Sequence, residues 1–408
     1  MRDEPGGAPP SLAERSLALG FAGLDAEAVF ALREGTAWRH FPADRADRFV
    51  PLLGIPDLDA FLATDAARLP RVTMADSRRQ GSAAVPEDAF ARDDGRIEPA
   101  RLHALFDDGA TLVVSQFHEH HPPLAAFCRG LERAFLHAVQ SNIYLTPGGI
   151  AGGAQGFRPH FDTHDVLVLQ VSGRKRWRLW NGTPFEHPTR RTPWRNQAVP
   201  EGAPTEVEMG PGDALYVPRG VMHDATALGE EPSLHATIGF LEPSMAEALR
   251  MALDVAELED PAFRAACPTW RLDDPEALAG LIGGLVPRLM EPEAVARLNA
   301  ALLNHLADLR LTLPARGLMP AALDPTRPVR LAEAVHHHLL ATPDGAAVLR
   351  AAGVEERLSP EEVGWLQAID EGVAPAALGA EALAARLHRL GVLETAPEAL
   401  PPDRHQGR

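Results

Sequence analysis

A chain of 408 residues, 45% hydrophobic and 23% charged, has the composition of a soluble globular protein and is long enough for two or three domains. Its formal net charge of −17 disfavours general binding to nucleic acid and suits a basic partner, although acidity also serves solubility alone. Two cysteines, Cys128 and Cys267, exclude a disulfide framework and a thiolate metal site and fit a reducing compartment.

Residues 1–15 are interpreted as a disordered leader. They lack the apolar core of a signal peptide. No later apolar run approaches the roughly 18 residues that a membrane span needs, so we expect a cytoplasmic protein without membrane contact. Residues 16–140 are predicted to form a helical N-terminal flank. Within it we expect a helix followed by a strand over residues 99–117, and an amphipathic helix that begins at the prolines of residues 122–139.

Residues 141–240 change to short β-rich runs separated by glycine and proline, such as "SNIYLTP", "DVLVLQVSG", "KRWRLW", "TEVEMGPGDALYVPRG" and "LHATIGF". Closely spaced strands of this kind predict a sandwich or jelly roll rather than alternating strands and helices. This segment is therefore predicted to be the core of the central domain.

His160 and Asp162 stand two residues apart in a predicted strand, so their side chains share one face and Phe161 points to the other. An imidazole and a carboxylate are two of the three ligands of the 2-His-1-carboxylate triad. We predict that His223, in the turn after a later strand, is the third. An isolated His-x-Asp pair is more often a surface histidine beside a solvated aspartate; the β context, His223 and a lone lysine between them favour a metal site.

That lysine is Lys175, the only one in the chain. In a strand it shares a face with Trp177 and Leu179, so we predict that it points inward, where an unpaired ammonium is costly. A carboxylate cosubstrate would satisfy it, with the far end paired to Lys175 and the near end chelating the metal. The alternative is a lysine whose ammonium reaches the barrel rim.

Further polar residues are predicted to line the same interior. Asn142, Tyr144 and Thr146 alternate along one face of a strand and would suit a dicarboxylate pocket better than a core. His235 lies on another polar face, between Ser233 and Thr237. It is either a cosubstrate contact or a core histidine with its hydrogen bonds satisfied.

Several other polar clusters are weaker candidates. The histidines of "HEHHPP" have metal-ligand spacing that many surface loops share, and the three histidines at 336–338 are predicted to lie on a helix, where adjacent residues diverge. A group of arginines is predicted to form a mobile rim. The residues concerned are His118, His120, His121, His336, His337, His338, Arg190, Arg191 and Arg195.

The C-terminal part returns to helical patterns. Residues 241–311 carry amphipathic helices with acidic starts. Residues 312–408 end in a helix, a turn, a second helix and a short strand, which is a winged-helix pattern. Its acidity argues against DNA binding, so we expect a role in protein interaction or scaffolding.

Residues 141–240 resemble the JmjC/cupin-type 2-oxoglutarate oxygenases and, more narrowly, the ribosomal oxygenases. The resemblance rests on "SNIYLTPGG", "GFRPHFDTHDVLVLQVSGRKRWRLW", "PGDALYVPRGVMHDA" and "SLHATIGF". It implies an α+β chain: a double-stranded β-helix (jelly roll) with a helical N-terminal flank, a helical dimerisation region and a C-terminal winged-helix-like domain. It also implies Fe(II) held by His160, Asp162 and His223, and 2-oxoglutarate held by Lys175 and assisted by Asn142, Tyr144 or Thr146.

The activity that the resemblance implies is a dioxygenase that uses O2 and 2-oxoglutarate to hydroxylate a side chain, arginine or histidine, of a basic protein such as a ribosomal protein. It also implies a homodimer, and no sequence-specific contact with nucleic acid. Two alternatives stay open: tailoring of a peptide or small metabolite, and a non-catalytic cupin-like binding or scaffold protein. One departure from the family is the glycine-rich loop at residues 146–157, which we interpret as a mobile lid or access loop.

Overall fold

The structure, a computed structural model, describes residues 10–182, 184–192, 198–271, 273–308, 322–332, 335, 337–342, 345–351, 354–370 and 372–395. The chain divides into two compact units, Met1–Ser244 and Met245–Arg408. Each unit is described by itself.

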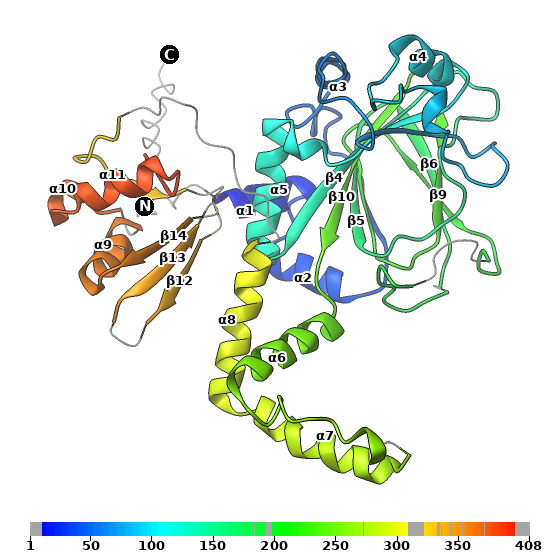
Figure 1. The fold of residues 1–408 in the computed structure, drawn as a ribbon. Coiled ribbons are helices and arrows are strands. Elements are labelled where there is room, and N and C mark those ends of the chain that lie inside the picture. Colours follow the sequence, from blue (N-terminus) through cyan, green and yellow to red (C-terminus); the bar gives the residue numbers. More distant parts are fainter. Residues whose placement is uncertain are drawn as a thin grey trace, which may run out of the picture. The chain divides into compact units, whose positions relative to one another are not determined.

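The first unit holds the strands of the predicted jelly roll and the helices that cover it (Figure 1). In chain order its elements are α1 (Leu12–Gly20), α2 (Ala26–Glu34), β1 (Arg39–Phe41), α3 (Ile55–Leu62), β2 (Val72–Ala75), η1 (Glu87–Ala89), α4 (Pro99–Asp107), β3 (Thr111–Val114), η2 (Phe117–Glu119), α5 (Pro122–Phe135), β4 (Ala138–Thr146), β5 (Asp165–Ser172), β6 (Arg174–Leu179), β7 (Thr205–Met209), β8 (Ala214–Val217), β9 (His223–Leu228) and β10 (Ser233–Leu241).

Two antiparallel sheets make the jelly roll. The larger has seven strands in the order β1-β8-β5-β10-β4-β3-β2, and the smaller has three in the order β7-β6-β9. In Figure 1, β4, β10 and β5 lie side by side, and β6 and β9 belong to the other sheet. Apolar side chains of both sheets, among them Val168, Trp177 and Leu215, pack together as one buried cluster. The predicted α+β jelly roll is confirmed.

The N-terminal flank covers the larger sheet with helices but also extends it. Helix α5 buries Leu124, Phe127 and Leu131 against the sheet, as its apolar stripe predicts. The sequence predicts strand β3 but not β1 or β2, so the predicted helical flank with one strand is incomplete. Strands of three and four residues contain too few alternations to be recognised in a sequence.

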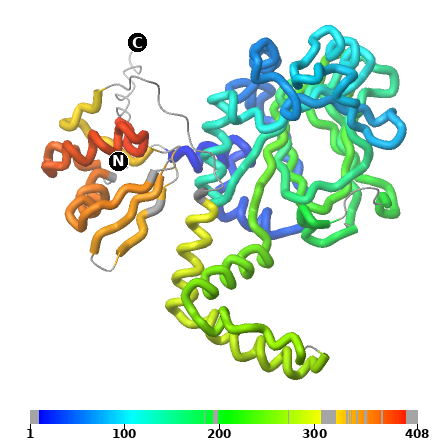
Figure 2. The backbone as a smooth tube through the Cα atoms, viewed as in Figure 1, coloured from blue at the N-terminus to red at the C-terminus, as the bar shows by residue number. Residues whose placement is uncertain are grey.

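The second unit begins with three helices, which Figure 2 traces in green to yellow: α6 (Met245–Glu259), α7 (Pro275–Leu289) and α8 (Pro292–Asp308), with the 3-10 helix η3 (Thr269–Arg271) between the first two. Many of their apolar side chains are exposed. These are Met245, Leu249, Leu253, Leu258, Leu278, Leu281, Ile282, Val286, Met290 and Val295.

The rest of the second unit mixes strands and helices: β11 (Val329–Leu331), β12 (His337–Ala341), β13 (Ala347–Ala351), β14 (Val354–Leu358), α9 (Pro360–Asp370), α10 (Pro375–Leu378), α11 (Glu381–Arg389) and β15 (Leu393–Thr395). The sheets are β12-β13-β14 and β11-β15. The predicted order of helix, turn, helix and short strand is present from α9 to β15.

The expectation of helices with one short final strand in the C-terminal part is incomplete, because five short strands occur there among the described residues. The helix predicted over the three histidines is wrong. His337 and His338 pair with β13 in β12, and His336 lies outside the described residues. Three identical polar residues in a row carry neither the helical nor the strand period. None of the described helices could cross a lipid bilayer, since each is too short or too polar.

Candidate metal centre and its surroundings

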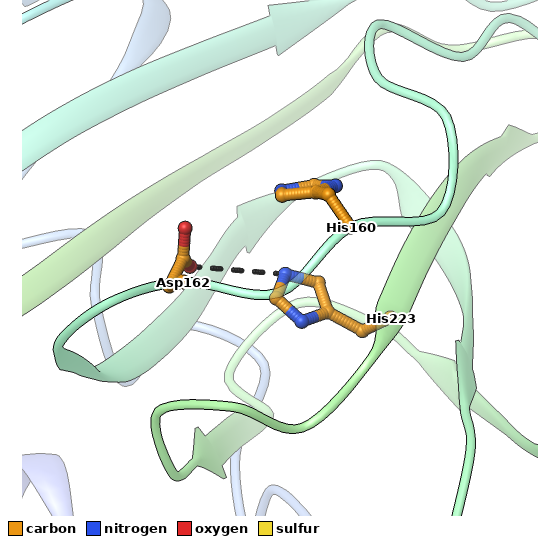
Figure 3. A group of neighbouring side chains, drawn as sticks. All are labelled: His160, Asp162 and His223. Atoms are coloured by element: carbon orange, nitrogen blue, oxygen red, sulfur yellow. Dashed lines mark ion pairs between the residues drawn. The ribbon is translucent and has the colours of Figure 1, made fainter. Parts of the chain in front are cut away.

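His160, Asp162 and His223 lie together inside the first unit (Figure 3), and one ligand atom from each lies within 4.8 Å of the others. The Nε2 atom of His223 is 3.8 Å from Oδ2 of Asp162. Among the described residues this is the one group of three or more histidine, cysteine or acidic side chains with such spacing. The sequence predicted all three members.

Backbone hydrogen bonds assemble the group. His160 and His223 exchange both of their backbone hydrogen bonds, at 3.0 and 2.7 Å. This pair is an isolated bridge, so the regular strand predicted over residues 160–162 is wrong, and His223 is the first residue of β9 rather than part of the preceding turn. The alternation still holds locally: Phe161 is turned away and buried with Trp180 and Met222.

Each histidine ring is held in one tautomer by a carbonyl two residues before it. Nδ1–H of His160 donates to the carbonyl oxygen of Arg158 at 2.8 Å, and Nδ1–H of His223 donates to that of Val221 at 2.9 Å. A neutral ring that donates through Nδ1 presents an unprotonated Nε2. Two imidazole nitrogens and one carboxylate therefore fit a divalent metal with open coordination positions.

Burial and neighbouring charges set the protonation states of His223 and Asp162. Burial, followed by the neighbouring His160, lowers the pKa of His223 despite the opposing influence of Asp162. Burial by itself would raise the pKa of Asp162, but His223 and His160 hold it below its ordinary value. At neutral pH the expected state is a neutral His223 beside an ionised Asp162, which is the state that binds a metal ion.

Lys175 points inward, as the alternation of β6 predicts. It is 4% exposed and shares its face with Trp177 and Leu179, whereas Arg174 and Arg178 lie on the outer face. Its Nζ atom lies 3.3 Å from Nδ1 of His235, and within the described part of the chain no carboxylate forms an ion pair with it. Burial lowers the pKa of Lys175 to about 7. The interior thus contains a desolvated amine that lacks an anion.

Six aromatic side chains form a closed circuit of ring contacts between the metal group and the surroundings of Lys175. Successive ring centroids are 4.6 to 6.2 Å apart. In order around the circuit they are His160, His223, Trp177, His235, Tyr144 and Phe157. The rings of Tyr144 and His235 are stacked, 4.8 Å apart and 5° from parallel. Trp177 and Phe157 were not predicted as site residues, although Trp177 shares the inward face of Lys175.

The other residues predicted to line the pocket have different surroundings. The Oδ1 atom of Asn142 accepts a hydrogen bond from the backbone of Gln116 at 3.1 Å. The hydroxyl of Thr146 is buried and hydrogen-bonds that of Thr111 at 3.0 Å. Of the three, Tyr144 has the ring that joins the circuit, and burial followed by the nearby Asp162 carboxylate raises the pKa of its phenol.

The glycine-rich loop is fixed to the small sheet. Gly149 donates to the carbonyl of Gly229, and the carbonyl of Ala154 accepts from Ala227, both at 2.9 Å, so the loop runs along β9. A pocket of about 450 Å³ lies between the loop and the outer face of β6, lined in part by Arg176 and Arg178. Those side chains face away from Lys175. These contacts argue against the lid interpretation.

The weaker candidates from the sequence do not form a second site among the described residues: two of the histidines make hydrogen bonds to backbone groups, and two of the arginines are exposed. His118 is buried, its Nδ1 accepts from the backbone of Ser141, and burial lowers its pKa to about 4. His121 donates to the carbonyl of Leu52. Arg190 and Arg191 are exposed, and Arg195 lies outside the described residues.

Comparison with known proteins agrees with this geometry. Residues 114–248 match the JmjC domain family. The chain is 32% identical over 182 residues to the bifunctional lysine-specific demethylase and histidyl-hydroxylase NO66 of Dictyostelium discoideum, covering 43% of this chain and 35% of that protein. With NO66 of Culex quinquefasciatus the identity is 34% over 163 residues, 39% of this chain and 24% of the other. The chain thus spans about a third or less of the length of these relatives.

Solved structures with the same fold cover nearly the whole chain. Escherichia coli YcfD has a TM-score of 0.55 and 19% identity over 91% of this chain and 98% of that one. The ribosomal oxygenase YcfD from Escherichia coli in complex with cobalt and 2-oxoglutarate has a TM-score of 0.53 and 18% identity, with 91% and 98% coverage. Residues 114–248 thus match the JmjC domain family, within a chain that has the fold of YcfD.

Proposed function

We propose that this protein is an Fe(II)- and 2-oxoglutarate-dependent oxygenase that hydroxylates an arginine or histidine side chain of a ribosomal protein. One observation carries the proposal: a 2-His-1-carboxylate group and a buried lysine, without an anionic partner among the described residues, face the same interior and are joined by a series of aromatic ring contacts. The names of the NO66 relatives and the cobalt and 2-oxoglutarate complex of YcfD support it.

His160, Asp162 and His223 would bind the metal ion. His160 and His223 would hold the metal through Nε2, and Asp162 would offset part of its charge. When bound, iron together with O2 and 2-oxoglutarate supplies the oxidation, with succinate, CO2 and an alcohol as products. The hydrogen bonds from Nδ1 to Arg158 and Val221 keep both rings aimed while ligands exchange.

Lys175 would bind the far carboxylate of 2-oxoglutarate. An ammonium has three donors, and its contact with His235 Nδ1 engages one of them, which leaves two for a carboxylate. A bound carboxylate would favour the charged amine and so reverse the effect of burial. Trp177 contacts both His223 and His235, so its ring forms an apolar wall that extends from the metal end to the lysine end.

The exposed apolar faces of α6–α8 support a further proposal, that the protein is a homodimer. On α6, Met245, Leu249 and Leu253 recur every four residues and form one stripe, 80%, 59% and 47% exposed. Contiguous exposed apolar surface of this kind is usually covered by a partner, and a second copy is the commonest one.

We also propose a cytoplasmic location and a protein-binding role for the acidic C-terminal part, with a basic substrate matched to the net charge of −17.

Two assays test the function. The first measures succinate formed from 2-oxoglutarate by the protein with Fe(II), with and without ribosomal proteins. The second compares the masses of ribosomal proteins from cells that have or lack the protein, and we expect one to gain a single oxygen atom. No succinate under any condition would leave a non-catalytic binding protein. Succinate without a modified ribosomal protein would favour a peptide or small-molecule substrate.

A further inference from the structure

A buried carboxylate, that of Asp165, connects the two loops that carry the metal ligands. Asp165 is the first residue of β5, three residues after Asp162, and is 3% exposed. Its Oδ1 accepts a hydrogen bond from the backbone N–H of Arg219 at 2.9 Å, and its Oδ2 accepts one from the hydroxyl of Tyr216 at 2.8 Å. A guanidinium nitrogen of Arg33 lies 3.7 Å from the same Oδ2. The charge of Asp165 is therefore fully engaged.

The backbone that Asp165 holds is the turn before His223. Val221 donates to the carbonyl of Pro218 at 3.2 Å, and Gly220 has φ +87°, which a turn of type II requires at its third position. Arg219 and Gly220 are the two central residues of this turn. The N–H of Arg219 goes to Asp165, and the N–H of Gly220 goes to the carbonyl of Asp162 at 3.0 Å. Both central amides thus bind the loop that carries the acidic ligand.

The last residue of the turn fixes the orientation of the His223 ring. The carbonyl of Val221, the last residue of the turn, accepts the hydrogen bond from Nδ1–H of His223. A rotation of the turn would move that carbonyl, and with it the direction in which Nε2 points. The side chain of Arg219 is fixed as well, 3.5 Å from Oε1 of Glu242. A continuous path of contacts therefore runs from Asp165 through the turn to His223.

We infer that Asp165 is a positioning residue of the metal centre, which acts by locking the 218–221 turn against the Asp162 loop and so aims the Nε2 of His223. This inference rests on the proposed metal site and adds to it a residue that no ligand pattern contains. Direct hydrogen-bond partners of metal ligands typically change metal affinity roughly 10- to 100-fold when removed. Asp165 acts on His223 through the turn, so the effect of removing it should be at or below the lower end of that range.

The molecule contains a matched control. Glu132 on α5 is also a fully buried carboxylate, and it too accepts hydrogen bonds from a backbone amide, that of Val139 at 3.1 Å, and from a side chain, Arg129 at 2.8 Å. Arg129 belongs to α5 and Val139 to β4, so these two contacts lie outside the loops that carry the metal ligands. Loss of Glu132 and loss of Asp165 should therefore lower the stability of the fold by comparable amounts, while only Asp165 should affect the metal.

The experiment titrates chelator-stripped full-length protein with Co²⁺ and follows both the dissociation constant and the visible spectrum of the bound ion. Melting temperatures of the apo forms are measured in parallel. We expect Asp165→Ala to weaken Co²⁺ binding by roughly five- to tenfold and to change the spectrum. Glu132→Ala should leave the dissociation constant within about twofold of the unaltered protein. Tyr216→Phe, which keeps the bond to Arg219, should be milder than Asp165→Ala.

The outcomes separate the two proposals. If the unaltered protein does not bind Co²⁺, the metal site itself is wrong. If it binds Co²⁺ and Asp165→Ala binds as tightly as Glu132→Ala, the positioning role is overturned. Should Asp165→Ala fail to fold, Arg219→Pro removes the backbone N–H that Asp165 accepts, and proline suits the second position of a type II turn. An affinity and spectrum for Arg219→Pro identical to those of the unaltered protein would also overturn it.

Discussion

The Nζ atom of Lys175 lies 3.3 Å from Nδ1 of His235, and both side chains are almost fully buried. Burial lowers the pKa of both groups, and the nearby lysine lowers that of His235 further. The amine of Lys175 and the imidazole of His235, both bases, therefore lie in contact where burial disfavours the protonated form of each. A dicarboxylate arriving between the metal group and Lys175 would restore the charge on the amine, and this expectation leads to the first two predictions.

Replacing Lys175 should weaken binding of 2-oxoglutarate. Loss of one partner of a buried, hydrogen-bonded charge pair costs roughly 2–5 kcal/mol, or about 30- to several-thousand-fold in affinity. Lys175→Ala should therefore raise the KM for 2-oxoglutarate at least by tens of fold in the succinate assay. Lys175→Arg should be milder, because it keeps the charge but needs more room. An unchanged KM in Lys175→Ala would place the cosubstrate elsewhere.

Binding of 2-oxoglutarate should weaken above neutral pH. With the pKa of Lys175 near 7, the unliganded amine loses its proton as the pH rises through that value, and a dicarboxylate binds the protonated form. The dissociation constant, measured by calorimetry with a redox-inert divalent metal, should rise by up to about tenfold per pH unit above pH 7. Lys175→Arg stays charged and should show a flatter profile. Parallel profiles for the two proteins would contradict the assignment.

The three metal ligands should be individually indispensable. His160→Ala, Asp162→Ala and His223→Ala each remove one of the three donors of the group, so Co²⁺ binding and succinate formation should both be lost. Far-UV circular dichroism should barely change, because the jelly roll is held by its own cores. His164→Ala, in the same stretch but outside the group, is the control and should bind Co²⁺. Full turnover in any ligand variant would remove that residue from the site.

Charge on the apolar stripe of α6 should separate the proposed dimer. Leu249→Asp combined with Leu253→Asp places carboxylates where a partner would bury them, and burying unpaired charges is strongly unfavourable. Light scattering at micromolar concentration should show a dimer for the unaltered protein and a monomer for the variant. Val50→Asp, a change at a residue that is 59% exposed in the first unit, should leave the mass unchanged. A monomeric unaltered protein would refute this proposal.

Two neighbouring glycines give a test of how firmly the 146–157 loop is fixed. Gly152 and Gly153 have φ of +81° and +84°, so alanine at either costs roughly 1–2 kcal/mol. A Cβ at Gly153 would lie 2.4 Å from Cγ2 of Thr226, whereas at Gly152 it would meet nothing within 4 Å. Gly153→Ala should therefore lose about 1–3 kcal/mol more stability in urea unfolding than Gly152→Ala. Equal losses would mean that the loop moves away easily.

Alternation along strands made most of the site predictable. In β6 the charged and apolar residues alternate so regularly that the inward direction of Lys175 follows from the sequence alone. The same period placed His160 and Asp162 on one side even though no regular strand forms there, because extended backbone suffices for it. Period alone does not say what a residue will meet. Thr146 was expected to line the pocket, but it lies opposite Thr111 on β3 and hydrogen-bonds it.

Residues that act through long-range contacts could not be found from the sequence. Asp165 begins a strand that reads as apolar, and its backbone partner Arg219 is 54 residues away. Phe157 contacts His160 and Tyr144 only because the glycine-rich loop returns beside them. The short strands β1 and β2 form where a neighbouring strand offers a free edge, which is a property of the folded sheet.

The chain of 408 residues contains a single lysine, so only one of its side chains is a primary amine that can lose a proton at alkaline pH. The other strongly basic side chains are arginines, whose guanidinium groups keep their protons throughout the pH range in which proteins are handled. Both tyrosines and Cys128 have raised pKa values because they are buried. Burial lowers the pKa of Lys175 to about 7, so this amine changes its charge near neutral pH, where the guanidinium groups, both tyrosines and Cys128 do not. Proton uptake measured just above neutral pH when a dicarboxylate binds should therefore include the proton that Lys175 takes up inside the jelly roll.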